Sequence, residues 1–262
     1  MSESKPKKSL GQHWLYDEPT LRAIIDCAEV SPKDTVLEIG PGLGTLTKQL
    51  VQRAEHVVAV EFEQELADAL PTTVDDHVLD VVHEDILKYD LSALPPGYKV
   101  VANIPYYLTS NLIRVLCESL NPFSTAAILI QKEVAERVAA QPGQMSILSV
   151  SAQYYCDVSL GPVVPAELFT PPPKVDSQVL VLHYRSEPLF EGVDTKQFFR
   201  LVKAGFSQKR KTLENALSGG LAIGKPEARA LLEAADIPAG QRAQALSLDD
   251  WYALYEVYAQ AT

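Results

Sequence analysis

Short apolar runs and amphipathic stretches alternate over the first two thirds of the 262-residue chain. Short apolar runs bounded by turn residues predict buried strands, whereas apolar positions three and four residues apart predict helices. The expected strands or extended segments are 35–39, 57–61, 78–83, 100–102, 126–130, 157–164 and 175–184. The expected helices are 19–30, a stretch that ends at Leu50, 64–70, 110–119, 131–140 and 146–155. This alternation of strands and helices predicts an α/β domain.

The pattern changes after Pro188, and from Thr195 onward the apolar spacing is helical throughout. The expected helices in this part are 198–206, 211–217, 227–235 and 248–258. We therefore expect a catalytic α/β domain over residues 1–186 and a small all-helical domain over residues 187–262.

A glycine or a polar residue stands at or just after the end of each of four successive predicted strands. These residues are Gly40, Glu61, Asp85 and Asn103. In an open α/β sheet, ligands bind where the carboxyl ends of the strands meet. We therefore expect the four residues to lie along one edge of the sheet and to form a ligand site.

A glycine-rich loop, Gly40-Pro41-Gly42-Leu43-Gly44, joins the first of these strands to a helical stretch. The order strand, loop, helix brings backbone N–H groups close to a ligand at a helix N-terminus. The dinucleotide-binding fingerprint needs a third glycine at position 45, and Thr45 stands there, so that site is excluded. For the loop alone, a tight turn without a ligand is a serious alternative.

Acidic residues stand at the carboxyl ends of the next two strands. Glu61 lies 21 residues after Gly40, where a carboxylate is well placed to accept hydrogen bonds from both hydroxyls of a ribose. Helix capping or simple solvation is the alternative for this residue. Asp85 follows the third strand and is a candidate acceptor for the exocyclic amine of a bound adenine.

The segment Asn103-Ile104-Pro105-Tyr106-Tyr107 follows the fourth strand, and Pro105 prevents that strand from continuing. The Asn103 side-chain oxygen and nearby backbone carbonyls can accept hydrogen bonds from an exocyclic amine. A tyrosine ring beside them can stack on the base that carries this amine. The alternative is a turn with a capping asparagine and two core aromatic residues.

The composition, with 47% hydrophobic and 22% charged residues, is typical of a globular protein. No apolar run approaches the ~20 residues of a membrane span, and the polar N-terminus does not match a signal peptide. Cys27, Cys117 and Cys156 form neither a disulfide framework nor a zinc-binding pattern. We therefore expect a cytoplasmic protein with no metal site.

The net charge of −11 and the pI of about 4.9 argue against a nucleic-acid partner, because phosphate binding favours a basic surface. The basic residues are nevertheless clustered, and Lys5, Lys7 and Lys8 lie together near the N-terminus. A second cluster without acidic residues comprises Lys203, Lys209, Arg210 and Lys211. We hypothesise that the second cluster binds RNA phosphates; a solvated face is the alternative.

Six short motifs are spread over nearly the whole chain: Ser9–Leu15, Glu38–Gly44, Asn103–Tyr107, Gln131–Val134, Phe169–Ser177 and Phe206–Lys211. In combination they resemble the ribosomal RNA adenine dimethyltransferase family, specifically its small-subunit enzymes. Two positions depart from that resemblance. Trp14 stands where the family usually has phenylalanine, and Gln144–Ile147 replaces a segment that often carries a basic residue.

The resemblance implies a Rossmann-like methyltransferase sheet that binds S-adenosylmethionine. The cofactor-binding residues that it implies are His13, Leu15, Gly40, Gly42, Glu61, Asp85, Ile86 and Asn103. The catalytic residues that it implies are Asn103, Pro105, Tyr106 and Phe169, with Tyr106 and Phe169 on either side of a flipped adenine. Enzymes of this family dimethylate two adjacent adenines near the 3′ end of small-subunit rRNA. The implied partner is the rRNA of an immature ribosomal particle, and we expect a monomer with no membrane partner.

Three other functions fit parts of this pattern. Phe169–Ser177 and Phe206–Lys211 favour the small-subunit enzyme over a large-subunit rRNA adenine dimethylase of the antibiotic-resistance type. The presence of Glu61, Asp85 and Asn103 argues against a non-catalytic RNA-binding assembly or transcription factor. A protein-glutamine methyltransferase is the third alternative, since related asparagine-proline-tyrosine motifs serve there.

Overall fold

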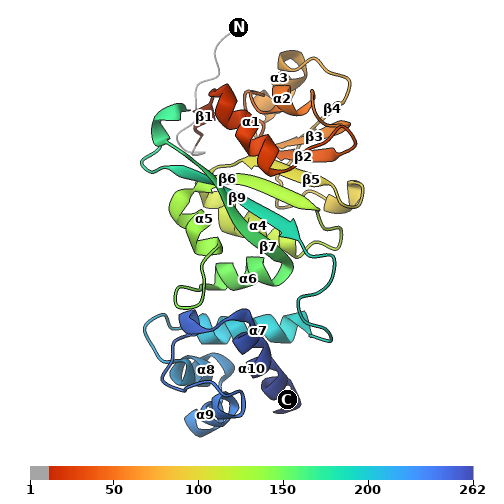
Figure 1. The fold of residues 1–262 in the computed structure, drawn as a ribbon. Helices are drawn as coiled ribbons and strands as arrows, with labels where there is room; N and C mark the ends of the chain where they lie inside the picture. The colour runs from red at the N-terminus through yellow and green to blue at the C-terminus, as the bar shows by residue number, and fades with distance from the viewer. Residues whose placement is uncertain (1–11, 262) are drawn as a thin grey trace. The chain divides into compact units, whose positions relative to one another are not determined.

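The computed structural model describes residues 12–261, so Lys5, Lys7, Lys8 and the start of the first motif lie outside the described residues. The chain forms two compact units, which are labelled by their elements in Figure 1. Unit 1 comprises the chain up to Glu136 together with Cys156–Tyr184. Unit 2 comprises Arg137–Tyr155 together with the chain from Arg185 onward.

Unit 1 is built around a seven-stranded sheet with the order β4-β3-β2-β5-β6-β9-β7. The strands from β4 to β6 in this order run parallel, and β9 runs antiparallel to both of its neighbours. The bounds are β2 (Thr35–Ile39), β3 (His56–Glu61), β4 (Leu79–His83), β5 (Lys99–Asn103), β6 (Thr125–Gln131), β7 (Cys156–Val164) and β9 (Ser177–Tyr184). Each expected strand is present with its ends shifted by at most two residues, and the α/β class is confirmed.

Helices cover the sheet of unit 1, because its central parallel strands carry apolar side chains on both faces. Asp17 caps the first helix, whose residues Leu21, Ile24 and Ile25 are buried in a core that includes strand residues. Figure 1 shows β2, β5 and β6 between α1 and α4. The helices are α1 (Glu18–Cys27), α2 (Thr47–Leu50), α3 (Gln64–Thr73), α4 (Thr109–Cys117), α5 (Lys132–Val138) and the 3₁₀ turns η2 (Leu91–Ala93), η3 (Tyr106–Leu108) and η4 (Ala166–Leu168).

The central strand β2 lies at the point where the strand order reverses. The chain continues from β2 to β3 and β4 on one side, and then returns to β5 and β6 on the other. Ile39, the last residue of β2, pairs with Val60 of β3 and Ala102 of β5. The segments that follow these strands therefore open from β2 in opposite directions, which creates the crevice in which α/β proteins bind ligands.

A second, two-stranded sheet was not expected from the sequence. It pairs β1 (Trp14–Leu15) antiparallel with β8 (Phe169–Thr170). Beside it, the His13 Nδ1–H donates a 2.7 Å hydrogen bond to the Pro171 carbonyl. This pairing joins the first described residues to the segment that carries Phe169, although more than 150 positions separate them in sequence.

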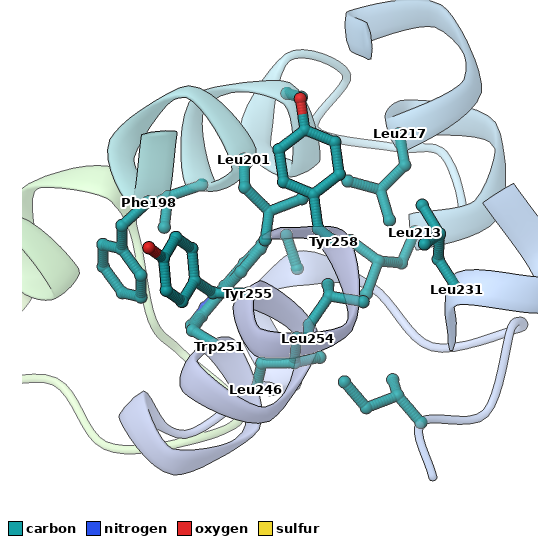
Figure 2. Close-up of a cluster of buried hydrophobic side chains, with 14 of the residues drawn as sticks. Phe198, Leu201, Leu213, Leu217, Leu231, Leu246, Trp251, Leu254, Tyr255 and Tyr258 are labelled. Atoms are coloured by element: carbon teal, nitrogen blue, oxygen red, sulfur yellow. The ribbon is translucent and has the colours of Figure 1, made fainter. Parts of the chain in front are cut away.

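Unit 2 is all-helical, as expected. Its elements are α6 (Ile147–Tyr155), α7 (Thr195–Phe206), α8 (Leu213–Leu221), α9 (Lys225–Ala234), η5 (Ala243–Ala245) and α10 (Leu248–Ala261). Figure 2 shows side chains such as Leu201, Leu217 and Trp251 converging in its core. α7 and α10 approach closely at Gly205, because a Cβ atom there would lie 2.4 Å from the Trp251 ring.

The expected boundary near residue 186 differs from the observed division at one segment. Residues 137–155 were expected in the α/β domain, but Met145, Val150 and Tyr154 share the hydrophobic core of unit 2. An amphipathic helix buries its apolar face against whichever element is available, and the apolar pattern alone does not identify that element. Among residues 12–261, no helix is both long enough and apolar enough to cross a membrane.

Candidate active site

A pocket with a volume of about 280 Å³ lies at the carboxyl ends of β2, β3, β4 and β5 in unit 1. All eleven of the predicted cofactor-binding and catalytic residues line it. They are His13, Leu15, Gly40, Gly42, Glu61, Asp85, Ile86, Asn103, Pro105, Tyr106 and Phe169. The predicted gathering of strand-end residues is therefore present in the structure.

The glycine loop and Glu61 hold each other in place. Gly42 has a φ of +57°, and its N–H donates to Glu61 Oε2 at 3.1 Å. A Cβ atom at Gly42 would lie 2.6 Å from the Trp14 ring, so only glycine fits this backbone beneath that ring. Glu61 Oε1 accepts a second hydrogen bond from the Glu63 N–H at 2.8 Å. Burial raises the pKa of Glu61, and these N–H groups partly offset that effect.

The segment after β4 supplies one polar and one apolar wall. Asp85 Oδ1 accepts a hydrogen bond from the Leu87 N–H at 3.0 Å, which fixes the carboxylate at the pocket. Ile86 is buried, with 5% of its surface exposed. An apolar face beside a carboxylate acceptor suits a flat base with an exocyclic amine.

Asn103 ends β5, and Gly40 passes close to it, since a Cβ atom on Gly40 would lie 3.9 Å from the Asn103 carbonyl oxygen. Tyr106 follows in η3, where its hydroxyl is hydrogen-bonded to the buried Ser177 hydroxyl at 2.9 Å. Burial is the main cause that raises the pKa of Tyr106. Tyr107 is 66% exposed, so the alternative of two core aromatic residues does not hold for it.

Two further rings flank Tyr106 or share its pocket. The His13 ring stacks against Tyr106 with centroids 5.9 Å apart and an interplanar angle of 23°. Phe169 lies in β8 and is only 3% exposed. The β1–β8 pairing thus brings His13 and Phe169 to the same pocket as Tyr106.

Sequence reasoning did not single out Glu38, the most deeply buried acidic residue of the pocket. Glu38 lies in β2 with 1% of its surface exposed, and neither carboxylate oxygen has a hydrogen-bond partner among the described residues. The pKa of Glu38 is raised to about 8, chiefly by burial; the Thr47 hydroxyl acts in the opposite direction, and the Glu61 charge contributes to the rise. That hydroxyl is close enough to favour the ionised form but does not have hydrogen-bonding geometry. The available signal was a carboxyl group inside a buried strand, a rare position for glutamate.

The predicted RNA-binding residues lie elsewhere, in unit 2, and do not line the pocket. Lys203 is exposed in the last turn of α7, which ends at Phe206. Lys209, Arg210 and Lys211 are exposed in the turn before α8, which we call the basic turn. The expected helix 211–217 begins instead at Leu213, so Lys203 and the basic turn do not share one helical face. None of the four forms an ion pair with another residue in the described range 12–261.

A metal-binding arrangement is not seen in the described part of the chain, where no group of three or more histidine, cysteine or acidic side chains could hold an ion.

The family model described as ribosomal RNA adenine dimethylase matches residues 3–260. The chain belongs to the ribosomal RNA adenine dimethylase family. The resemblance inferred from the six motifs is therefore confirmed.

The similarity to known proteins covers almost the whole chain. Ribosomal RNA small subunit methyltransferase A of Dehalococcoides mccartyi is 41% identical over 259 residues, which cover 97% of this chain and 89% of the relative. A solved dimethyladenosine transferase from Plasmodium falciparum has a TM-score of 0.81 at 26% identity, over 95% of this chain and 98% of that one. The solved 23S rRNA methyltransferase ErmE has a TM-score of 0.76 at 29% identity, over 94% and 100%. The Rossmann-like methyltransferase fold with a helical C-terminal part is thus confirmed.

Proposed function

We propose that the protein transfers methyl groups from S-adenosylmethionine to N6 of two adjacent adenines near the 3′ end of small-subunit rRNA, and dimethylates each of them. The substrate is the rRNA of an immature small-subunit particle. The observation that carries this proposal is the convergence of the glycine loop, Glu61, Asp85 and Asn103 on one pocket at the strand-order reversal.

The residues of the pocket fit S-adenosylmethionine. Glu61 is held by the Gly42 and Glu63 N–H groups and can accept hydrogen bonds from the ribose hydroxyls. Asp85 and Ile86 suit the adenine amine and ring, and His13 and Leu15 also line the pocket. Glu38 presents a buried carboxyl group without a donor, which suits a ligand that carries positive charge. When bound, this cofactor supplies a methyl group attached to a sulfonium sulfur. The neutral thioether that remains after transfer is a good leaving group.

Asn103 is proposed to activate the target amine. The N6 lone pair of adenine is delocalised into the ring, so the amine is a poor nucleophile. Hydrogen bonds from N6–H to the Asn103 side-chain oxygen and to the Ile104 or Pro105 carbonyl would localise that lone pair and orient it. Positioning and electrostatic stabilisation then supply much of the rate enhancement, and no general base with an unusual pKa is required.

Tyr106 and Phe169 are proposed to hold the flipped adenine between their rings. The hydrogen bond from Tyr106 to Ser177 and the burial of Phe169 restrict both rings before the base arrives. The same site must accept an N-methyl amine for the second transfer. It therefore binds the base chiefly by stacking and does not require two N–H hydrogen bonds in each cycle.

The proposed docking surface for rRNA comprises Lys203 and the basic turn. Their exposure and their lack of ion pairs with described residues support phosphate contacts, since those side chains are available to a partner. The ErmE likeness keeps a large-subunit substrate as the second candidate. The small-subunit candidate is favoured by the 41% identity to a small-subunit methyltransferase over 97% of the chain.

The decisive experiment is methyl transfer from labelled S-adenosylmethionine to isolated immature small subunits, with large subunits as the control. Mapping of the modified bases should find dimethylation at two adjacent adenines near the 3′ end of the small-subunit rRNA. Methylation of the large subunit alone would favour the ErmE-like substrate. Cofactor binding without methylation of either particle would favour a non-catalytic factor.

A further inference from the structure

Two carboxyl groups on neighbouring strands of the pocket have opposite surroundings. Glu61 of β3 accepts hydrogen bonds from the Gly42 and Glu63 N–H groups. Glu38 of β2 is more deeply buried, at 1% against 6% exposure, and no described donor reaches either of its oxygens. An ionised carboxylate without donors or a cation is very costly in such a place, whereas the neutral acid is tolerated.

The charged groups around Glu38 reinforce this difference. Glu61 faces it from β3, and the paired residue on β5 is Val101, which does not titrate. From α2, the Thr47 hydroxyl lowers the pKa of Glu38. The other titratable side chains that line the pocket are His13, Glu63, Glu84, Asp85, Tyr106 and Tyr107, and none of the described lining residues is lysine or arginine. The pocket thus offers carboxyl groups and no permanent cation of its own.

We propose that Glu38 is protonated in the cofactor-free protein and releases this proton when S-adenosylmethionine binds, so that the carboxylate becomes a counter-ion of the cationic cofactor. This inference rests on the proposed function, because it takes S-adenosylmethionine as the ligand. The released proton goes to the solvent, and no bond of the cofactor forms or breaks. The cofactor, with its sulfonium and ammonium groups, replaces the proton as the positive charge beside Glu38.

The dependence of cofactor affinity on pH follows from the proton that Glu38 must release. Below the raised pKa of Glu38, the free protein holds the proton, and cofactor binding must remove it. Cofactor affinity should therefore rise with pH by up to about tenfold per unit below pH ~8 and level off above it. Glu38→Gln keeps the shape of the neutral acid but has no proton to release, so its affinity should be weaker and should lack this rise.

The test is calorimetric titration of the full-length protein with S-adenosylmethionine at pH 7, in buffers of different ionisation enthalpy. The number of released protons follows from the difference in measured heat. Wild type should release close to one proton more than Glu38→Gln. Glu84→Gln is the matched control, because Glu84 also lines the pocket, and it should release as many protons as wild type. All other groups of the pocket are the same in wild type and Glu38→Gln, so the difference in proton release reports on Glu38.

A second measurement uses only the wild-type protein and therefore tests the inference even if Glu38→Gln does not fold. In the cofactor-free wild type labelled with ¹³C at glutamate carboxyl groups, one glutamate should titrate several units above the others, and cofactor should abolish that titration. Equal proton release by wild type and Glu38→Gln, or the absence of a high-pH glutamate in the wild type, would overturn the inference. Cofactor binding without the extra proton would contradict only the role of Glu38. A complete lack of cofactor binding would contradict the proposed function as well.

Discussion

The pocket of unit 1 and the basic turn of unit 2 differ in how firmly the fold holds their side chains. In the pocket, the Glu61 carboxylate accepts hydrogen bonds from two backbone N–H groups, and the Tyr106 hydroxyl is hydrogen-bonded to the Ser177 hydroxyl. In the basic turn, Lys209, Arg210 and Lys211 are all exposed and form no ion pair with the described residues. The first region is built for one ligand geometry, whereas the second offers charge without a defined geometry.

This difference explains how a protein with a net charge of −11 is compatible with an RNA substrate. Chemistry on one base requires fixed donors, acceptors and stacking surfaces, and these are found in the pocket. Docking on a phosphate backbone needs only local positive charge, which a short turn can supply. The overall charge of the chain is therefore a poor guide to its partner when the basic residues are clustered.

The largest effect should come from Asn103→Ala, which removes the proposed acceptor for the target amine. We expect turnover to fall by on the order of 100-fold or more, with a much smaller change in affinity for the particle. Single-turnover methyl transfer to immature small subunits measures this effect. Asn111 is exposed on α4, so Asn111→Ala is the matched control and should retain the wild-type rate. A near-normal rate for Asn103→Ala would remove Asn103 from the mechanism.

Glu61→Ala should weaken cofactor binding by roughly 10- to 100-fold, because two charge-assisted hydrogen bonds to the ribose are lost. It also leaves the Gly42 N–H without its acceptor, which loosens the glycine loop. Calorimetry with S-adenosylmethionine provides the measurement, and Glu65→Ala on the exposed side of α3 is the control. Unchanged affinity in a folded Glu61→Ala protein would rule out the ribose assignment.

Gly205→Ala tests the close contact between α7 and α10 in unit 2, the unit that also contains the basic turn. The added Cβ would lie 2.4 Å from the Trp251 ring, so repacking should lower the stability of unit 2 by about 1–3 kcal/mol. Thermal unfolding should show this loss, while cofactor affinity stays the same. Gly240→Ala is the control, because a Cβ atom there meets nothing within 4 Å. Equal stability of the two variants would contradict the tight α7–α10 contact.

The smallest change in free energy is expected for the basic turn itself. Replacement of Lys209, Arg210 and Lys211 by glutamine should reduce the slope of log affinity against log salt by about 2–3, from up to three lost phosphate contacts. Binding of the variant to immature small subunits over a range of salt concentrations measures this slope. Cofactor affinity should not change, since none of these residues lines the pocket. A wild-type slope would leave the basic turn as a solvated surface.

The same contrast marks how far the sequence predicted the molecule. Strand positions and the gathering of Gly40, Glu61, Asp85 and Asn103 followed from apolar runs and from the geometry of parallel sheets, which are local rules. The β1–β8 pairing did not follow, because two-residue strands have no apolar periodicity. The buried state of Glu38 was also not predicted, since it depends on the strands and helix that pack around it.

Long-range packing also explains the remaining differences. Residues 147–155 were correctly expected to be helical, but their partner is the core of unit 2, and no local pattern identifies such a partner. The end of α7 at Phe206 is where the sequence predicted it, whereas the next helix begins at Leu213 and not at residue 211, because an amphipathic pattern does not mark the first residue of a helix reliably.

The central claim is that the pocket at the carboxyl ends of β2 to β5 holds the methyl donor with its reactive end toward Asn103. A crystal structure of the protein with S-adenosylhomocysteine tests this claim most directly. We predict that both ribose hydroxyls lie within hydrogen-bonding distance of the Glu61 carboxylate, that the adenine amine meets Asp85, and that the sulfur points toward Asn103. A ligand bound outside this pocket, or one whose ribose does not contact Glu61, would contradict the account.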